Sequence, residues 1–204
     1  RGGGPGVAAG ACPRWGGAPP GGAGGGPPPP PLVMPADLVI AAERPDQAEV
    51  VALLARLDAY LASLYAPDDN HVLSVDELLA PAVRFVVARV NGAVVGCGAA
   101  RRMPGEPATA GAAYGEVKRM MVDPAHRGRR IGARLLATIE AGLRDDGIAL
   151  ALLETGRDQH AALRLYERAG YTRRRAFGGY PDNGLSVFMH KRLHGGAHDG
   201  EAAR

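Results

Sequence analysis

Apolar and polar residues alternate along residues 38–192 in a pattern that predicts strands and amphipathic helices in turn. Short apolar runs, many rich in β-branched residues, predict seven strands, at 38–42, 84–90, 93–99, 114–122, 148–154, 171–177 and 185–192. Apolar residues spaced i, i+3, i+4 and i+7, with a shorter capped segment, predict four helices, at 45–64, 74–80, 131–147 and 162–169. The order β-α-α-β-β-β-α-β-α-β-β predicts a single mixed α/β domain, with about seven strands in the sheet and about four flanking helices.

Three local signals sharpen this pattern. Asn91-Gly92 separates two strands, and this pair favours the positive φ angles of a two-residue hairpin turn. Ser74 and Glu77 have the spacing of a capping box, which predicts that a helix begins there. Pro45 is suited to the first turn of the helix predicted at 45–64.

The two ends of the chain depart from the pattern. Residues 1–31 contain 12 Gly and 9 Pro, and such a segment cannot bury enough apolar surface to offset its ordering entropy. We therefore expect residues 1–33 to form a disordered leader, 36–193 the domain and 194–204 a flexible tail. The first methionine is Met34, so we expect the leader to lie upstream of the natural start or to be a processed or cloned remnant.

Charge, apolar runs and cysteines limit the possible partners. The formal net charge is +3, to which Arg1 and Arg14 contribute two, so the domain is close to neutral and gives no case for nucleic acid. No apolar run approaches the ~18–20 residues of a membrane span, so we expect no membrane partner. The two cysteines, Cys12 and Cys97, give no disulfide framework, which fits a reducing, cytoplasmic location. Cys97 is expected to be a small buried apolar residue.

Residues 122–133 carry the clearest chemical signal. A strand ends, Pro124 turns the chain, and a helix begins in a loop that holds Arg127, Arg129 and Arg130. The first N–H groups of a helix lack partners within the helix, and the helix dipole adds partial positive charge to them. The segment is therefore suited to bind a phosphate group, although a basic loop before an ordinary helix would look the same.

The chain resembles the GCN5-related N-acetyltransferases (the GNAT superfamily) over about residues 36–193, and is similar to a bacterial branch of it. The acetyl-CoA loop of that family reads Arg/Gln-x-x-Gly-x-Gly/Ala after a strand and before a helix. Arg127, Gly132 and Ala133 match this pattern, whereas Arg130 stands where the family usually has glycine. Similar segments follow at 153–156, 162–171, 177–180 and 186–189, and one precedes the loop at 116–122.

The resemblance implies which residues bind acetyl-CoA and which act in catalysis. Cofactor binding is expected from Met120, Met121, Val122, Arg127, Gly128, Arg129, Arg130, Ile131, Gly132 and Ala133. Backbone N–H groups of the loop would hold the pyrophosphate, the strand edge would pair with the pantetheine arm, and the Met120 N–H would polarise the thioester carbonyl. Glu116 would act as general base and Tyr166 would protonate the departing thiolate.

The chemistry explains these residue types, and each has an alternative. An amine with a pKa near 10 must lose a proton before it attacks a thioester, and a carboxylate can accept that proton. Glu116 could instead be a solvated residue at a strand start, and Tyr166 a core residue with a satisfied hydroxyl. Glu154 and Thr155 could assist the base or only support the following loop. Arg130 could hold phosphate or crowd the loop.

We therefore expect an acetyl-CoA-dependent N-acetyltransferase that uses no metal and exists as a monomer or homodimer. The acceptor would be a primary amine on a small molecule or a protein, and His71 is a candidate residue of the acceptor site. One alternative is an acyl-CoA-binding domain without turnover. Another is an enzyme acting on aminoacyl-RNA through Arg129, Arg130 and the basic run 173–175.

Overall fold

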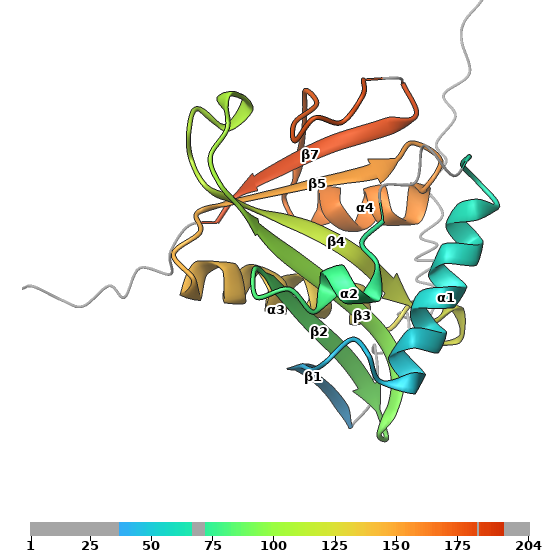
Figure 1. Ribbon diagram of the computed structural model, residues 1–204. Coiled ribbons are helices and arrows are strands. Elements are labelled where there is room, and N and C mark those ends of the chain that lie inside the picture. Colours follow the sequence, from blue (N-terminus) through green and yellow to red (C-terminus); the bar gives the residue numbers. More distant parts are fainter. Residues whose placement is uncertain (1–36, 67–71, 183, 194–204) are drawn as a thin grey trace, which may run out of the picture. The chain divides into compact units, whose positions relative to one another are not determined.

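The computed structural model describes residues 37–66, 72–182 and 184–193. These residues contain seven strands in one mixed sheet of order β1-β2-β3-β4-β5-β7-β6 (Figure 1). The strands are β1 (Leu38–Ala42), β2 (Val83–Val90), β3 (Ala93–Met103), β4 (Tyr114–Val122), β5 (Leu150–Gly156), β6 (Thr172–Arg174) and β7 (Ser186–Arg192). The helices are α1 (Ala48–Ala62), α2 (Val75–Leu78), α3 (Ile131–Asp145) and α4 (His160–Arg168), with short 3-10 turns at Pro107–Thr109 and Pro124–His126. The predicted fold class and element order are confirmed.

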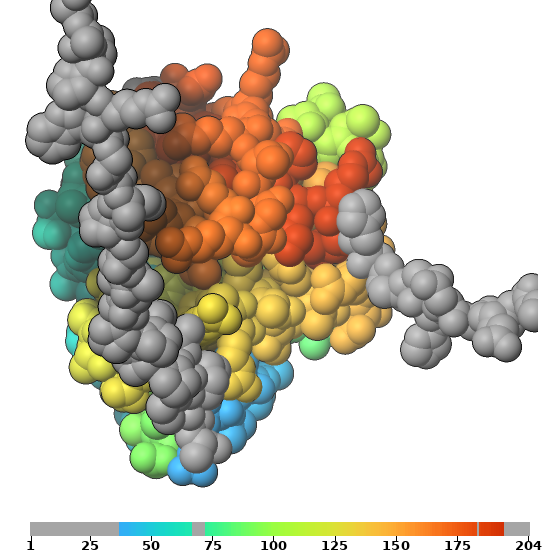
Figure 2. Space-filling model, turned by 180° about the vertical axis from the view of Figure 1, so that it is seen from behind, coloured from blue at the N-terminus to red at the C-terminus, as the bar shows by residue number. Residues whose placement is uncertain are grey.

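The sheet is antiparallel except where β4 pairs with β5. Parallel neighbours need a long crossover connection, and α3 supplies it. Helices α1 and α2 lie on one face of the sheet, and α3 and α4 lie on the other (Figure 1). Figure 2, seen from behind, shows the segments of α3 and α4 next to each other on that second face.

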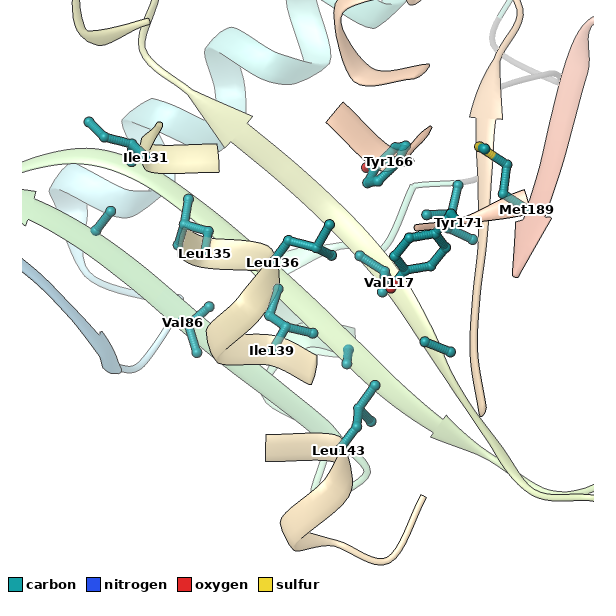
Figure 3. Packing of buried hydrophobic residues seen from close by; sticks show 14 of the residues in the cluster. Val86, Val117, Ile131, Leu135, Leu136, Ile139, Leu143, Tyr166, Tyr171 and Met189 are labelled. Carbon is teal, nitrogen blue, oxygen red and sulfur yellow. The ribbon is translucent and has the colours of Figure 1, made fainter. Parts of the chain in front are cut away.

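The largest group of buried residues lies between the sheet and the helices α3 and α4. Ile131, Leu135, Leu136, Ile139 and Leu143 form one stripe along α3 and face the sheet (Figure 3). Full burial of such a side chain contributes about 1.5–3 kcal/mol, so this stripe fixes α3 on the sheet. A second buried cluster joins the α1 stripe to β2 and β3 on the other face.

The local signals act as the sequence predicts, with shifts at element ends. Asn91 and Gly92 have φ angles of 49° and 80° in the β2–β3 turn. The Ser74 hydroxyl accepts from the Glu77 N–H, and the Glu77 carboxylate accepts from the Ser74 N–H, which completes the capping box. Helix α1 begins at Ala48, after the cap residue Gln47, so Pro45 precedes the helix and is not in its first turn.

The strand predicted at 171–177 is too long. Only Thr172–Arg174 pair with β7. The Phe177 ring instead packs edge-on against Tyr114 of β4 and Phe188 of β7, with ring centroids 5.7 and 5.9 Å away. The burial of this aromatic ring therefore ends β6 three residues before Phe177.

The predicted leader (1–33) and tail (194–204) lie outside the described residues. No helix among the described residues is long and apolar enough to cross a membrane.

Candidate active site

The β-bulge in β4 creates the central feature of the site. Cys97 of β3 faces Met121, but Ala99 faces Lys118, so the single residue Gly98 lies opposite two residues of β4. Arg119, one of these two residues, has a φ of 57°, a left-handed conformation that costs a non-glycine residue about 1–3 kcal/mol. A Cβ at position 98 would lie 2.5 Å from the Met120 sulfur. The glycine therefore makes room for the Met120 side chain.

The bulge lies where β4 and β5 part. Their parallel pairing covers only 115–117 of β4 and 151–153 of β5, and beyond it the two strands diverge (Figure 1). From Lys118 onward, β4 therefore has no strand partner on the β5 side among the described residues. The Val122 carbonyl oxygen on this edge accepts a hydrogen bond from Arg127 Nε at 3.3 Å. An open strand edge of this kind can pair with an extended, amide-bearing ligand.

The N-terminus of α3 lies just beyond this open edge. Its cap residue, Arg130, makes no side-chain cap hydrogen bond, so the first N–H groups of the helix are available to a ligand. Arg130 has a φ of 56° and Gly128 a φ of 79°. The left-handed conformation at position 130 gives a physical reason for the glycine that the GNAT pattern has there. Arg127, Arg129 and Arg130 are exposed around this terminus and add positive charge.

Two cavities meet beside Met120 of β4 and Tyr166 of α4. The larger, called here the α3 groove, has a volume of ≈ 830 Å³ and runs along the open edge of β4 to the start of α3. Its lining includes Met120, Met121, Val122, Arg127, Gly128, Arg130, Ile131, Gly132 and Ala133. Nine of the ten residues predicted to bind the cofactor thus lie together, and Arg129 is not in the lining.

The smaller cavity, called here the β5 cavity, has a volume of ≈ 100 Å³ and lies between the C-terminal ends of β5 and α1. Among the described residues, the charged ones in its lining are Lys118, Arg119 and Glu154. It shares five residues with the α3 groove: Leu57, Met120, Gln159, Ala162 and Tyr166. A ligand in the α3 groove and one in the β5 cavity would therefore meet beside Met120 and Tyr166.

Tyr166 is placed by α4 at this junction. Its side chain belongs to the buried cluster, and its ring packs against Tyr171 with centroids 5.8 Å apart (Figure 3). Burial, and then the negative charge of Glu154, raise the pKa of the Tyr166 hydroxyl. The hydroxyl therefore keeps its proton at neutral pH and can act as a donor.

Glu116 lines neither cavity, although its neighbours Val117 and Lys118 line the β5 cavity. It is 4% exposed, and its Oε1 accepts a hydrogen bond of 2.5 Å from the Tyr180 hydroxyl. Lys118 Nζ donates to the same hydroxyl at 2.6 Å and lies 3.5 Å from Glu116 Oε1. Burial and the charge of Glu116 raise the pKa of Tyr180. Glu116 is thus enclosed by an ammonium group and a phenol.

Several residues of the β5 cavity were not predicted as site residues. The Arg119 guanidinium forms a two-pronged ion pair with Asp58 of α1, which ties the bulge to that helix. Tyr65 lies against Gly156, where a Cβ would meet the Tyr65 hydroxyl oxygen at 2.0 Å. Ser186 of β7 donates to Glu154 at 2.6 Å. The glycines of β3 were the available signal for the bulge, because glycine inside a strand often marks one.

The remaining sequence candidates have different outcomes. His71 lies outside the described residues. Cys97 is fully buried, as expected, and burial raises the pKa of its thiol to about 12, so it is no nucleophile at neutral pH. Among residues 37–66, 72–182 and 184–193, no group of three His, Cys, Asp or Glu side chains could hold a metal ion. That the chain uses no metal stays a prediction.

Comparison with known proteins places this geometry in a family. The model of the acetyltransferase (GNAT) family matches residues 51–171. An IAA acetyltransferase of Azospirillum brasilense is 45% identical over 157 residues, which are 77% of this chain and 99% of that protein.

Solved structures with a similar fold support the same family assignment. An acyltransferase structure from Klebsiella pneumoniae subsp. pneumoniae MGH 78578, described as an acyl-CoA N-acyltransferase, is 39% identical with a TM-score of 0.63, covering 77% of this chain and 98% of that one. The PaiA N-acetyltransferase of Thermoplasma acidophilum, solved with coenzyme A, shares the fold at 17% identity, with a TM-score of 0.59 over 76% of this chain and 99% of that one. The chain therefore belongs to the acetyltransferase (GNAT) family and is an N-acetyltransferase.

Proposed function

We propose that this protein transfers the acetyl group of acetyl-CoA to a primary amine of a small molecule or a protein by direct attack. The observation that carries the proposal is the junction at Met120 and Tyr166. There a groove suited to an extended, phosphorylated thioester opens into a separate, smaller cavity for a second substrate. No covalent enzyme intermediate is needed, because the two substrates can meet directly.

The residues of the α3 groove fit the parts of acetyl-CoA in order. The free N–H groups at the start of α3, with Arg127, Arg129 and Arg130 around them, suit the pyrophosphate. The open edge of β4 at 120–122 suits the amide groups of the pantetheine arm. Bound acetyl-CoA would supply the acetyl group as an activated thioester at the junction.

Two groups at the junction would assist the transfer. The Met120 N–H would donate to the thioester carbonyl oxygen and stabilise the negative charge that grows there during attack. Tyr166 would give its proton to the sulfur as the bond to carbon breaks. Because its pKa is raised, it would regain a proton from the attacking nitrogen in the same step and so avoid a lasting phenolate. The role of Glu116 as general base stays a prediction.

The test is a panel of primary amines incubated with acetyl-CoA, in which released CoA is detected with a thiol reagent. We expect CoA release that depends on an amine and produces the acetylated amine. Binding of CoA without release for any amine would instead support a binding domain without turnover. Release only with aminoacyl-RNA, weakened steeply by salt, would support the RNA alternative.

A further inference from the structure

We propose that Glu154 binds the ammonium group of the acceptor and takes its proton, and that the acceptor is a small protonated primary amine on an apolar stem. This inference rests on the proposed function. It assigns a role to a cavity residue and a chemical class to the unknown acceptor.

The position of Glu154 carries the first part of the inference. Glu154 lies on β5, one residue beyond the last residue that pairs with β4, where the two strands part. It is half-buried and lines the β5 cavity together with Met120 and Tyr166, the two residues of the junction. An amine at Glu154 would therefore lie on the acceptor side of the place where the thioester is expected.

The charges around the β5 cavity indicate that Glu154 can attract an ammonium group. Arg119 is paired with Asp58, and Lys118 is paired with Glu116. Glu154 accepts from the neutral Ser186 hydroxyl and has no cation within 4 Å among the described residues. Among the described lining residues, Glu154 is therefore the one carboxylate, and no cation pairs with it. A partly buried carboxylate in this condition attracts an ammonium group.

Among the described residues that line the β5 cavity, Glu154 is the group suited to accept a proton from the amine. Tyr166 of α4, Tyr65 at the end of α1 and Tyr180 keep their protons at neutral pH, because burial raises the pKa of each. Lys118 and Arg119 on β4 are donors only. Glu116 is separated from the cavity lining and is held by Tyr180 and Lys118, so we assign it to positioning that cluster.

The walls of the β5 cavity define the acceptor's stem. Polar side chains come from β4, β5 and α4, and the apolar part of the wall is formed by Leu57 and Leu61 of α1 together with Val72 and Leu185, so the stem would lie on that side. The volume of ≈ 100 Å³ suits a short stem. Among the described lining residues, Lys118 and Arg119 are already paired with Glu116 and Asp58, so a carboxylate beside the amine would gain no new ion pair there and plain amines are favoured over amino acids.

The first step moves one proton from the ammonium group of the acceptor to Glu154. An N–H bond of the ammonium group breaks, its electron pair stays on nitrogen, and an O–H bond forms on Glu154. The neutral nitrogen then attacks the acetyl carbon and the C–S bond breaks. Tyr166 gives its proton to the sulfur and takes the second proton from the nitrogen, and Glu154 releases the first proton to solvent after the product leaves.

The experiment compares Glu154→Gln, Glu116→Gln and, as matched control, Glu167→Gln, an exposed carboxylate on α4. The probes are 3-methylbutylamine and leucine, which share the stem and amine and differ by a carboxylate. We expect 3-methylbutylamine to be the better acceptor. Glu154→Gln should lower kcat/KM at pH 7 by ~10²-fold or more, with recovery as the pH approaches the amine pKa near 10 and with CoA affinity unchanged. Glu116→Gln should cause a smaller loss without that recovery, and Glu167→Gln none.

Other outcomes separate the two proposals. Full activity of Glu154→Gln, or recovery at high pH in Glu116→Gln alone, overturns the assignment of Glu154. Preference for leucine, or no acetylation of 3-methylbutylamine when other amines are acetylated, overturns the acceptor class. Both results leave the proposed function standing. Failure of the wild type to acetylate any amine contradicts the proposed function itself.

Discussion

The α3 groove and the β5 cavity share five residues, yet different parts of the chain build them. The groove uses backbone: the open edge of β4 and the free N–H groups at the start of α3. The β5 cavity uses side chains that come from both ends of the domain, such as Tyr65, Glu154 and Ser186. Backbone sites constrain a short local sequence, whereas side-chain sites spread their requirements over distant segments. Under the proposed function, local backbone geometry would bind the cofactor that the family shares, and distant side chains would bind the particular acceptor.

The largest effect is expected from a negative charge at the start of α3. Gly132→Asp should weaken CoA binding by roughly 100-fold, because the carboxylate lies where the helix dipole and free N–H groups should meet phosphate. Isothermal titration with CoA measures this change. Gly132→Ala is the control: its Cβ would lie 3.3 Å from a flexible Leu165 methyl group, so affinity should stay near that of the wild type. Equal affinity of the Asp variant and the wild type would remove α3 from the CoA site.

A change at the junction should affect chemistry and leave binding intact. Tyr166→Phe should lower kcat by about 10²-fold, because the ring still packs against Tyr171 but cannot donate to the sulfur. CoA affinity should change by less than a few fold, since Tyr166 supplies no phosphate contact. Steady-state kinetics with saturating acetyl-CoA measures the loss. An unchanged kcat, with chemistry shown to be rate-limiting, would leave Tyr166 as a core residue.

A substitution in the β5 cavity should separate the acceptor from the cofactor. Gly156→Ala should lower kcat/KM for the amine by roughly tenfold, because the new Cβ would force Tyr65 to move. CoA affinity should not change, because neither residue lines the α3 groove. The control is Ala137→Ser, which adds one atom on the exposed face of α3 outside both cavities. A parallel loss of CoA affinity in Gly156→Ala would show that the two cavities are not independent.

The smallest effect concerns backbone strain at the cap of α3. Arg130→Gly should stabilise the protein by about 1 kcal/mol, because glycine adopts a φ of 56° without the penalty of a side chain. The melting temperature should rise by about 2–4 °C, and CoA affinity should be unchanged or better. Arg129→Gly is the matched control and should not stabilise, since Arg129 is not among the residues with positive φ. A fall in CoA affinity for Arg130→Gly would show that this guanidinium holds phosphate.

This difference between the regions explains what the sequence could predict. The order of elements and the Asn91-Gly92 turn follow from local patterns, and the resemblance of the loop to the GNAT motif implied ten cofactor-binding residues, nine of which line the α3 groove. Periodicity reports local burial, and the loop motif reports a local backbone requirement. Both kinds of information are contained within about twenty neighbouring residues.

The β5 cavity could not be predicted in the same way. Arg119 and Asp58 meet across 61 positions, and Ser186 reaches Glu154 across 32. Such contacts depend on the bulge in β4 and on how far β5 diverges from it, which no local pattern specifies. Phe177 illustrates the same limit, since its distant aromatic partners end β6 early.

The most direct test of the central claim is a crystal structure of the protein with CoA. We predict that the pyrophosphate lies at the N–H groups of 131–133 and that the pantetheine amides pair with the β4 edge at 120–122. The sulfur should lie within hydrogen-bond distance of the Tyr166 hydroxyl and face the β5 cavity. CoA bound away from the open edge of β4, or a sulfur far from both Tyr166 and the β5 cavity, would contradict the account.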